Sequence, residues 1–132
     1  VDTLTRFVAP GVVVCMEPGV HDPNGGALEA VLADLRAFRD AKGRSLEVFT
    51  VPSPGRVVDR DERLMPASYV NFYIANRAVV VPAYGVRQDE DALRRISALF
   101  PGREAVAVPA KELLEGGGAF HCITQQMPRG TA

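Results

Sequence analysis

The sequence lacks the features that mark several common protein classes. Its 15 Lys and Arg residues are balanced by 16 Asp and Glu residues, so the net charge of −1 gives no basic excess. Domains that bind nucleic acids usually carry such an excess as a basic patch. No apolar run approaches the roughly 20 residues that a membrane-spanning helix needs. We therefore expect neither a nucleic-acid partner nor a membrane partner.

Cysteine and histidine are also scarce. The two cysteines, Cys15 and Cys122, could form one disulfide but no framework of disulfides. Two Cys and two His without close spacing disfavour a structural zinc site. Cys15 lies in the apolar run Val12–Met16, where a cysteine usually acts as a small core residue. These observations predict a reduced, cytoplasmic protein without a metal site.

Two stretches of the chain predict the same order of elements: strand, strand, helix and strand. In the first stretch, Pro10-Gly11 separates two apolar runs, and a helix is expected between an N-cap at Asn24 and a stop at Gly43. The expected strands cover residues 7–8, 12–16, 46–51, 69–74, 78–81 and 105–108, and the expected helices cover 28–38 and 93–100. Repeats of this size, about 3–55 and 66–109, predict an α/β ring or array of similar units.

A third, shorter unit follows as a closing segment over residues 110–128. Ala110–Leu114 suits a helical turn, and Phe120–Thr124 suits a strand. Between the two repeats, the charged segment Val57–Met65 is interpreted as a solvated loop.

The most unusual stretch runs from Glu115 to Gln126, where three glycines lead into His121 and Cys122. Consecutive glycines permit positive φ angles and close approach of the backbone to a ligand. The stretch is either a loop that delivers a reactive cysteine or a flexible turn before a core strand with a buried cysteine. On a strand, adjacent side chains point to opposite faces, so His121 would face away from a site at Cys122. The other histidine, His21, has the surroundings of a surface loop residue.

The segment from Gly116 to Gln126 resembles the signature around the nucleophilic cysteine of agmatine deiminases, which belong to the guanidino-group-modifying, or pentein, superfamily. Three more segments are similar to the same family in the same order: Val1–Phe7, Asp22–Asn24 and Pro66–Ile74. The resemblance implies a five-bladed α/β propeller around a central substrate pit. This chain would be a partial propeller of about two ββαβ blades plus a closing strand, with further blades before Val1.

The activity implied by the resemblance is hydrolysis of agmatine to N-carbamoylputrescine and ammonia, a step of putrescine and polyamine biosynthesis. A Cys thiolate attacks the guanidinium carbon and forms a covalent amidino-thioether, which water then hydrolyses. By its position in the motif, Cys122 is the expected nucleophile. Because this chemistry uses only a thiolate, a histidine and carboxylates, we expect no cofactor.

The resemblance also assigns the substrate-binding residues. Asp2 matches the Asp of a His-x-Asp motif that binds the guanidinium, and the His of that motif would immediately precede Val1. Gly117 and Gly118 are expected to shape the loop that delivers Cys122. Asn71 is interpreted either as a residue that positions groups near the pit or as a structural residue at a strand end. One departure is Ala119, which occupies a place where the family motif has Asn, and a site hydrogen bond would be lost there.

Two other functions are compatible with the sequence. The chain could be a non-catalytic remnant that binds guanidino compounds or a partner chain, or a deiminase for peptidyl-arginine or a methylated arginine. A partial propeller would expose strand edges, which tend to pair with other chains. We therefore expect self-association, or docking onto the missing N-terminal blades.

Overall fold

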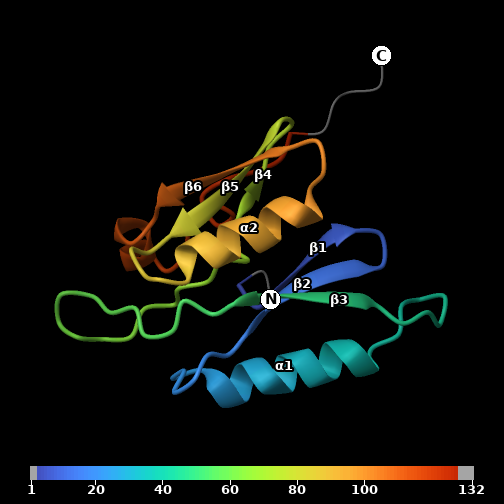
Figure 1. The fold of residues 1–132 in the computed structure, drawn as a ribbon, viewed down its shortest axis with the longest axis horizontal. Helices are drawn as coiled ribbons and strands as arrows, with labels where there is room; N and C mark the ends of the chain where they lie inside the picture. Colours follow the sequence, from blue (N-terminus) through green and yellow to red (C-terminus); the bar gives the residue numbers. More distant parts are fainter. Residues whose placement is uncertain (1–2, 128–132) are drawn as a thin grey trace.

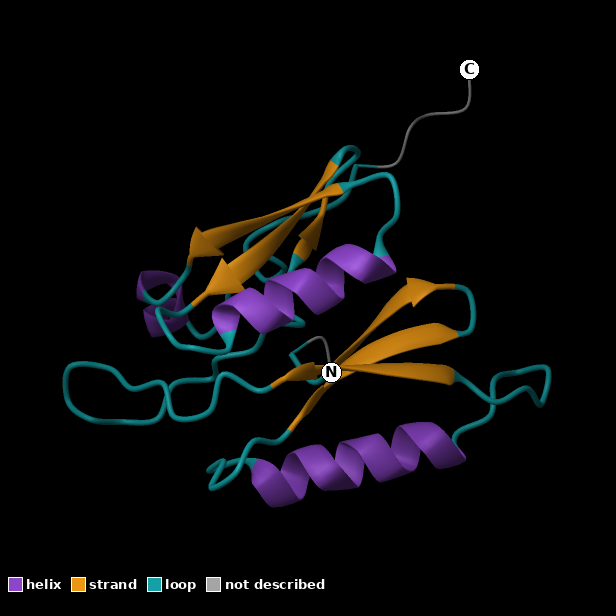
Figure 2. Cartoon of the chain, viewed as in Figure 1, coloured by secondary structure: helices purple, strands orange, loops and turns teal. Residues whose placement is uncertain are grey.

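The computed structural model describes residues 3–127, which form two three-stranded sheets and two α-helices (Figure 1). The elements in chain order are β1 (Thr5–Ala9), β2 (Val12–Glu17), α1 (Gly25–Ala37), β3 (Glu47–Pro52), β4 (Tyr73–Ile74), β5 (Ala78–Ala83), α2 (Asp89–Leu99), β6 (Glu104–Pro109) and the short 3-10 helix η1 (Glu112–Gly116). The expected order of strand, strand, helix and strand is therefore confirmed for both halves. Figure 2 shows the layers in the order α1, first sheet, α2, second sheet.

Each sheet combines an antiparallel hairpin with a parallel crossover. In the first sheet, β1 pairs antiparallel with β2, and β2 pairs parallel with β3 after the chain passes through α1. The second sheet repeats this pattern with β4, β5 and β6. The middle strands are covered on both faces, and Val13, Val14 and Cys15 of β2 are at most 2% exposed. Burial on both faces explains why these strands are continuous apolar runs in the sequence rather than alternating patterns.

Two expected boundaries are wrong. Helix α1 ends at Ala37, because the backbone of Phe38 is already extended, and Gly43 instead takes a positive φ in the turn that precedes β3. The expected strand over residues 69–74 is reduced to Tyr73–Ile74. The preceding residues, Tyr69 to Phe72, are all at most 1% exposed but form no ladder. Their polar groups are engaged by side chains and by a distant loop, as described below.

The hydrophobic core joins the two halves. Val14 and Met16 of the first sheet belong to the same buried cluster as Val79 and Val81 of the second. Aromatic side chains extend this core; for example, the rings of Phe72 and Phe100 meet edge to face with centroids 5.5 Å apart. Burial of such side chains contributes roughly 1.5–3 kcal/mol each, so the two halves stabilise one another.

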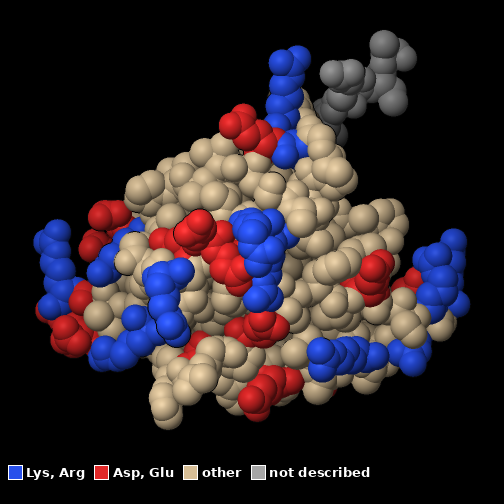
Figure 3. All heavy atoms as spheres, viewed as in Figure 1, with Lys and Arg blue, Asp and Glu red and all other residues tan. Residues whose placement is uncertain are grey.

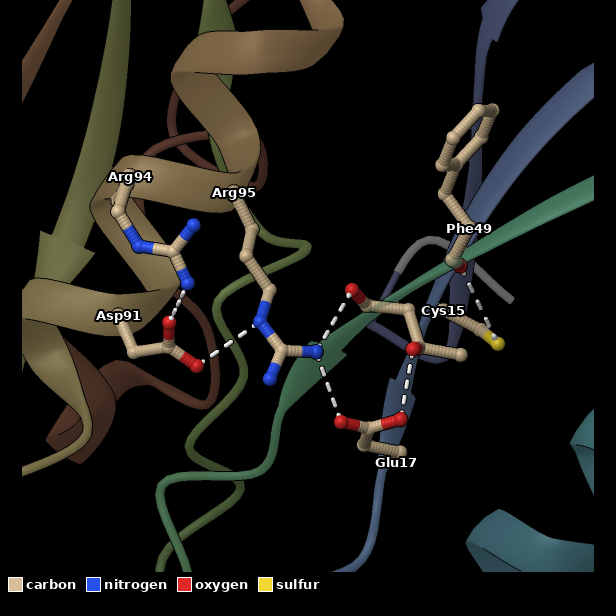
Figure 4. Close-up of polar contacts among 7 residues, drawn as sticks. Cys15, Glu17, Phe49, Asp91, Arg94 and Arg95 are labelled. Atoms are coloured by element: carbon tan, nitrogen blue, oxygen red, sulfur yellow. Dashed lines mark hydrogen bonds and ion pairs between the residues drawn. The ribbon is translucent and has the colours of Figure 1, made fainter.

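A polar clamp on the surface reinforces this contact (Figure 4). Arg95 of α2 donates to the Glu17 carboxylate of β2 at 2.8 Å and also lies 2.8 Å from Asp91 on its own helix. The hydroxyl of Thr50 on β3 donates to the same Glu17 carboxylate at 2.6 Å. The clamp therefore fixes α2 against the edge where β2 and β3 end.

The clamp predicts a specific pH dependence of stability. The Thr50 hydroxyl, and then the Arg95 guanidinium, lower the pKa of Glu17 below its ordinary value. A lowered pKa in the folded state contributes stability that is present above the unfolded pKa and is lost as pH falls through the folded pKa. Glu17→Gln should therefore cost about 0.5–1 kcal/mol in urea unfolding at pH 7 and much less near pH 3. Glu47→Gln, at an exposed position of β3, is the control. An equal loss at both pH values would contradict the role of the charge.

The surface shows no separation of charge in the view of Figure 3, where acidic and basic side chains are interspersed. None of the helices within residues 3–127 has the length and apolar character required to cross a bilayer.

Candidate active site

The segment that carries Cys122 is a compact turn, not the strand that was expected over Phe120–Thr124. The backbone N–H of Ile123 donates to the carbonyl of Ala119, and that of Thr124 donates to the carbonyl of His121. The Thr124 hydroxyl closes the turn further by donating to the Phe120 carbonyl at 2.7 Å. The inference that His121 must face away from Cys122 rested on strand geometry and therefore loses its basis.

Asn71 holds this turn, and we call residues 117–124 the cysteine loop. The Oδ1 atom of Asn71 accepts the backbone N–H groups of Ala119 (3.3 Å), His121 (3.0 Å) and Cys122 (3.4 Å). Its Nδ2 atom donates to the Cys122 sulfur at 3.1 Å. Asn71 is only 1% exposed, and both ends of its amide are engaged by the loop. An amide side chain supplies the acceptor and the donor on two separate atoms, as this arrangement uses them.

The two glycines expected to shape the loop do so in different ways. Gly117 has a φ of 91°, a left-handed conformation that favours glycine, and ends η1. Gly118 lies directly against the nucleophile candidate. A Cβ added at Gly118 would stand 2.4 Å from the Cys122 sulfur and 2.6 Å from its Cβ. The position of the thiol therefore requires that residue 118 have no side chain.

The two cysteines have opposite environments. Cys122 is exposed, whereas Cys15 is fully buried in β2, with its thiol 3.9 Å from the carbonyl oxygen of Phe49 (Figure 4). Burial raises the pKa of Cys15, which keeps its thiol protonated and unreactive. Cys122 is therefore the thiol that a reagent or substrate can reach.

The other candidate residues of the sequence are His21, Ala119 and Asp2. His21 lies in an exposed turn with a φ of 60°, in agreement with the interpretation as a loop residue. Ala119, at the position where the resemblance implies Asn, is fully buried in the core, so the loop packs there through a methyl group. Asp2 lies outside the described residues. The structure thus brings Asn71, Gly118 and Cys122 together.

Ser68 and Tyr84, which the sequence analysis did not name as site residues, support the segment that carries Asn71. The Tyr84 hydroxyl donates to the carbonyl of Ser68 and accepts the Ser68 N–H, both at 3.0 Å. Burial raises the pKa of Tyr84, so this hydroxyl stays protonated and can keep both bonds. Tyr84 and Ser68 lie 16 residues apart in the sequence. The one signal in the sequence is that Ser68 belongs to the segment Pro66–Ile74, which the family resemblance includes.

Comparison with known proteins defines the family. Residues 1–128 match the model of the Porphyromonas-type peptidyl-arginine deiminase family. Because this match covers nearly the whole sequence, the chain belongs to that family.

Individual relatives agree with this result. The agmatine deiminase of Stutzerimonas stutzeri is 38% identical over 146 residues, covering 97% of this chain and 40% of the relative. Among solved structures, the agmatine deiminase of Enterococcus faecalis superposes with a TM-score of 0.89 at 33% identity, covering 97% of this chain and 40% of that enzyme. That of C. jejuni gives a TM-score of 0.86 at 26% identity over 99% of this chain and 39% of that enzyme. The chain thus spans about two fifths of the length of these relatives.

Proposed function

We propose that this chain is the nucleophile-bearing part of an agmatine deiminase, with Cys122 as the nucleophile. The observation that carries the proposal is the exposed Cys122 thiol, held by the Asn71 amide on a loop where Gly118 leaves space beside the sulfur. The named relatives support agmatine as the substrate, because each of these proteins that the chain matches is an agmatine deiminase. A cysteine-to-serine variant of the C. jejuni agmatine deiminase has also been solved with substrate bound.

The reaction proceeds through a covalent intermediate. The Cys122 thiolate attacks the guanidinium carbon, and the tetrahedral adduct expels ammonia as a histidine donates a proton to the departing nitrogen. Water then attacks the amidino-thioether carbon and gives a proton back to the histidine. The C–S bond breaks, and N-carbamoylputrescine leaves with the thiolate restored. The histidine is supplied by the His-x-Asp motif, immediately before Val1, and no cofactor takes part.

Each site residue has a separate task in this mechanism. Asp2 accepts hydrogen bonds from the planar guanidinium, an arrangement for which a carboxylate is suited. Gly117 and Gly118 form the wall of the substrate site beside the thiol. Asn71 acts through Cys122, because its Nδ2–H donates to the sulfur and holds the side chain in one orientation.

The proposed architecture places residues 3–55 and 66–109 as two blades of a five-bladed propeller, closed by residues 110–128. Helix α2 lies between the two sheets, whereas α1 covers the outer side of the first sheet and buries only Leu28. By analogy between the repeats, the outer side of α1 is the surface where the N-terminal blades dock. Without them, exposed apolar side chains such as Phe38 favour self-association. We place the protein in the cytoplasm, in keeping with its two unpaired cysteines.

A turnover assay tests the proposed function. The chain would replace the segment that it matches in the E. faecalis enzyme, and the ureido product would be measured with agmatine and with benzoyl-arginine amide, a mimic of peptidyl-arginine. We expect turnover of agmatine, and a loss of about 10⁴-fold or more in Cys122→Ala. Cys15→Ala is the matched control and should retain turnover.

The outcomes separate the candidate functions. Preference for benzoyl-arginine amide would favour a peptidyl-arginine deiminase, the activity named for the family model. Undiminished turnover in Cys122→Ala would contradict the assignment of the nucleophile. Binding of agmatine without any turnover would favour the non-catalytic alternative.

A further inference from the structure

Residues 68–72, which we call the bracket, connect two parts of the chain that are far apart in sequence. On one side, Asn71 of the bracket holds the cysteine loop through four hydrogen bonds of its amide, described above. On the other side, the bracket contacts the first strand and the residues directly before it. The bracket itself is almost inaccessible, with Ser68 2% exposed and Phe72 fully buried.

Ser68 fixes the start of the described chain. Its hydroxyl donates to the carbonyl oxygen of Thr3 at 2.6 Å, a contact between residues 65 positions apart. The Ser68 hydroxyl oxygen also accepts the backbone N–H of Val70 at 3.2 Å. The Tyr84 hydroxyl holds the backbone of Ser68 at both its N–H and its carbonyl. The Ser68 side chain therefore has a fixed orientation, and Thr3 follows Asp2 directly in the sequence.

Arg6 provides a second contact to the same bracket. Its Nη1 atom donates to the carbonyl oxygens of Phe72 at 3.1 Å and Val70 at 3.5 Å, the residues on either side of Asn71. Its guanidinium also lies over the Phe72 ring, 5.0 Å from the centroid. A cation stacked on a ring and bound to two carbonyls has little freedom to move.

From these contacts we infer that Ser68 and Arg6 are positioning residues that hold the strand after Asp2 in fixed register with Cys122. This inference rests on the proposed function, in which the segment at Asp2 binds the guanidinium and Cys122 attacks it. The bracket carries both contacts, so it ties Thr3 and Arg6 to the loop that carries the nucleophile. Misplacement of about 1 Å between reacting groups can lower a rate by roughly 10²-fold.

The test compares two alkylating reagents at Cys122 in the chain joined to the remaining part of the E. faecalis enzyme, as in the turnover assay. Iodoacetamide is neutral and reports only on the exposure and ionisation of Cys122. Chloroacetamidine carries a planar amidinium and also reports on the binding group that recognises a guanidinium. Both rates are normalised to those of N-acetylcysteine, and the ratio of the two is the selectivity for the cationic reagent. The native chain should favour chloroacetamidine.

We expect Ser68→Ala to lower this selectivity about tenfold while the iodoacetamide rate stays within about twofold, because Asn71 still holds the cysteine loop. Ser68→Thr keeps the hydroxyl and should restore the selectivity. Ser53→Ala is the matched control, since Ser53 is also buried (3% exposed) and its hydroxyl oxygen accepts a backbone N–H, from Gly55. Arg6→Lys, a milder change, should give a smaller loss, and circular dichroism would verify the fold of every variant.

Different outcomes would contradict the proposed function and the positioning role of Ser68 and Arg6. A native chain without any selectivity for chloroacetamidine would overturn the proposed function. A selective native chain whose selectivity survives in both Ser68→Ala and Arg6→Lys would overturn the positioning role alone. Equal slowing of both reagents would also overturn it, because Ser68 would then only support the cysteine loop.

Discussion

Gly118→Ala is expected to lower kcat/KM by about 10²-fold or more. The added methyl group would stand 2.4 Å from the Cys122 sulfur and 2.6 Å from the Cys122 Cβ. Rotation of the Cys122 side chain can relieve the first clash but not the second, because Cβ does not move with χ1. The backbone must therefore shift, and Asn71 opposes this shift through the three N–H groups that it binds.

Gly116→Ala is the matched control for this prediction. A Cβ at Gly116 meets no atom within 4 Å, and its backbone has no positive φ. The substitution should leave turnover unchanged and stabilise the fold slightly, by about 0.4–1 kcal/mol. The measurement compares kcat/KM of the two variants, and thermal unfolding verifies that both are folded. Equal activity of Gly118→Ala and Gly116→Ala would show that the contact with Cys122 is irrelevant to the reaction.

Asn71→Ala is expected to lower both stability and turnover. It leaves the backbone N–H groups of Ala119 and Cys122 and the Cys122 thiol without the amide partner, whereas the His121 N–H keeps the backbone carbonyl of residue 71. Asn71 is buried where water cannot easily replace its side chain. Each stranded buried group costs about 1–3 kcal/mol, so we expect a total loss of roughly 2–4 kcal/mol in urea unfolding after partial relaxation. Turnover should fall about 10²-fold. Asn76→Ala, at an exposed position between β4 and β5, should change neither quantity measurably.

Asn71→Asp separates the two functions of the amide. A carboxylate retains the oxygen that accepts the loop N–H groups but loses the Nδ2–H donor to sulfur. It also places a negative charge beside Cys122, which disfavours the thiolate. We expect most of the stability to survive while iodoacetamide alkylation of Cys122 at pH 7.5 slows about tenfold. Alkylation at the native rate would argue that the Nδ2–sulfur contact has no effect on the thiol.

The parts of the fold that the sequence predicted are those that depend on local patterns. Both helices and the buried parallel strands produce apolar repeats that are readable without knowledge of their neighbours. The predictions that were wrong concern segments whose backbone conformation is determined by residues far away in the sequence. Residues 69–72 have the composition of a strand, but Arg6 and the cysteine loop engage their polar groups. Residues 120–124 fold into a turn because Asn71 binds the N–H groups that a ladder would need.

The site shows the same division. Cys122 and the glycines that shape its loop were identifiable from a contiguous motif. Ser68 and Arg6 were not, because their contacts join residues 64 to 66 positions apart and involve backbone carbonyls, which have no sequence signature. Asn71 was found as a candidate, but its burial under the loop required the structure.

The most direct test of the central claim is to trap the covalent intermediate. The chain, joined to the remaining part of the E. faecalis enzyme, would be mixed with agmatine, quenched in acid and digested for mass spectrometry. The account predicts an adduct of agmatine less ammonia on the peptide that contains Cys122, and none on the peptide that contains Cys15. Product formation with no adduct on Cys122, or with an adduct on Cys15, would contradict it.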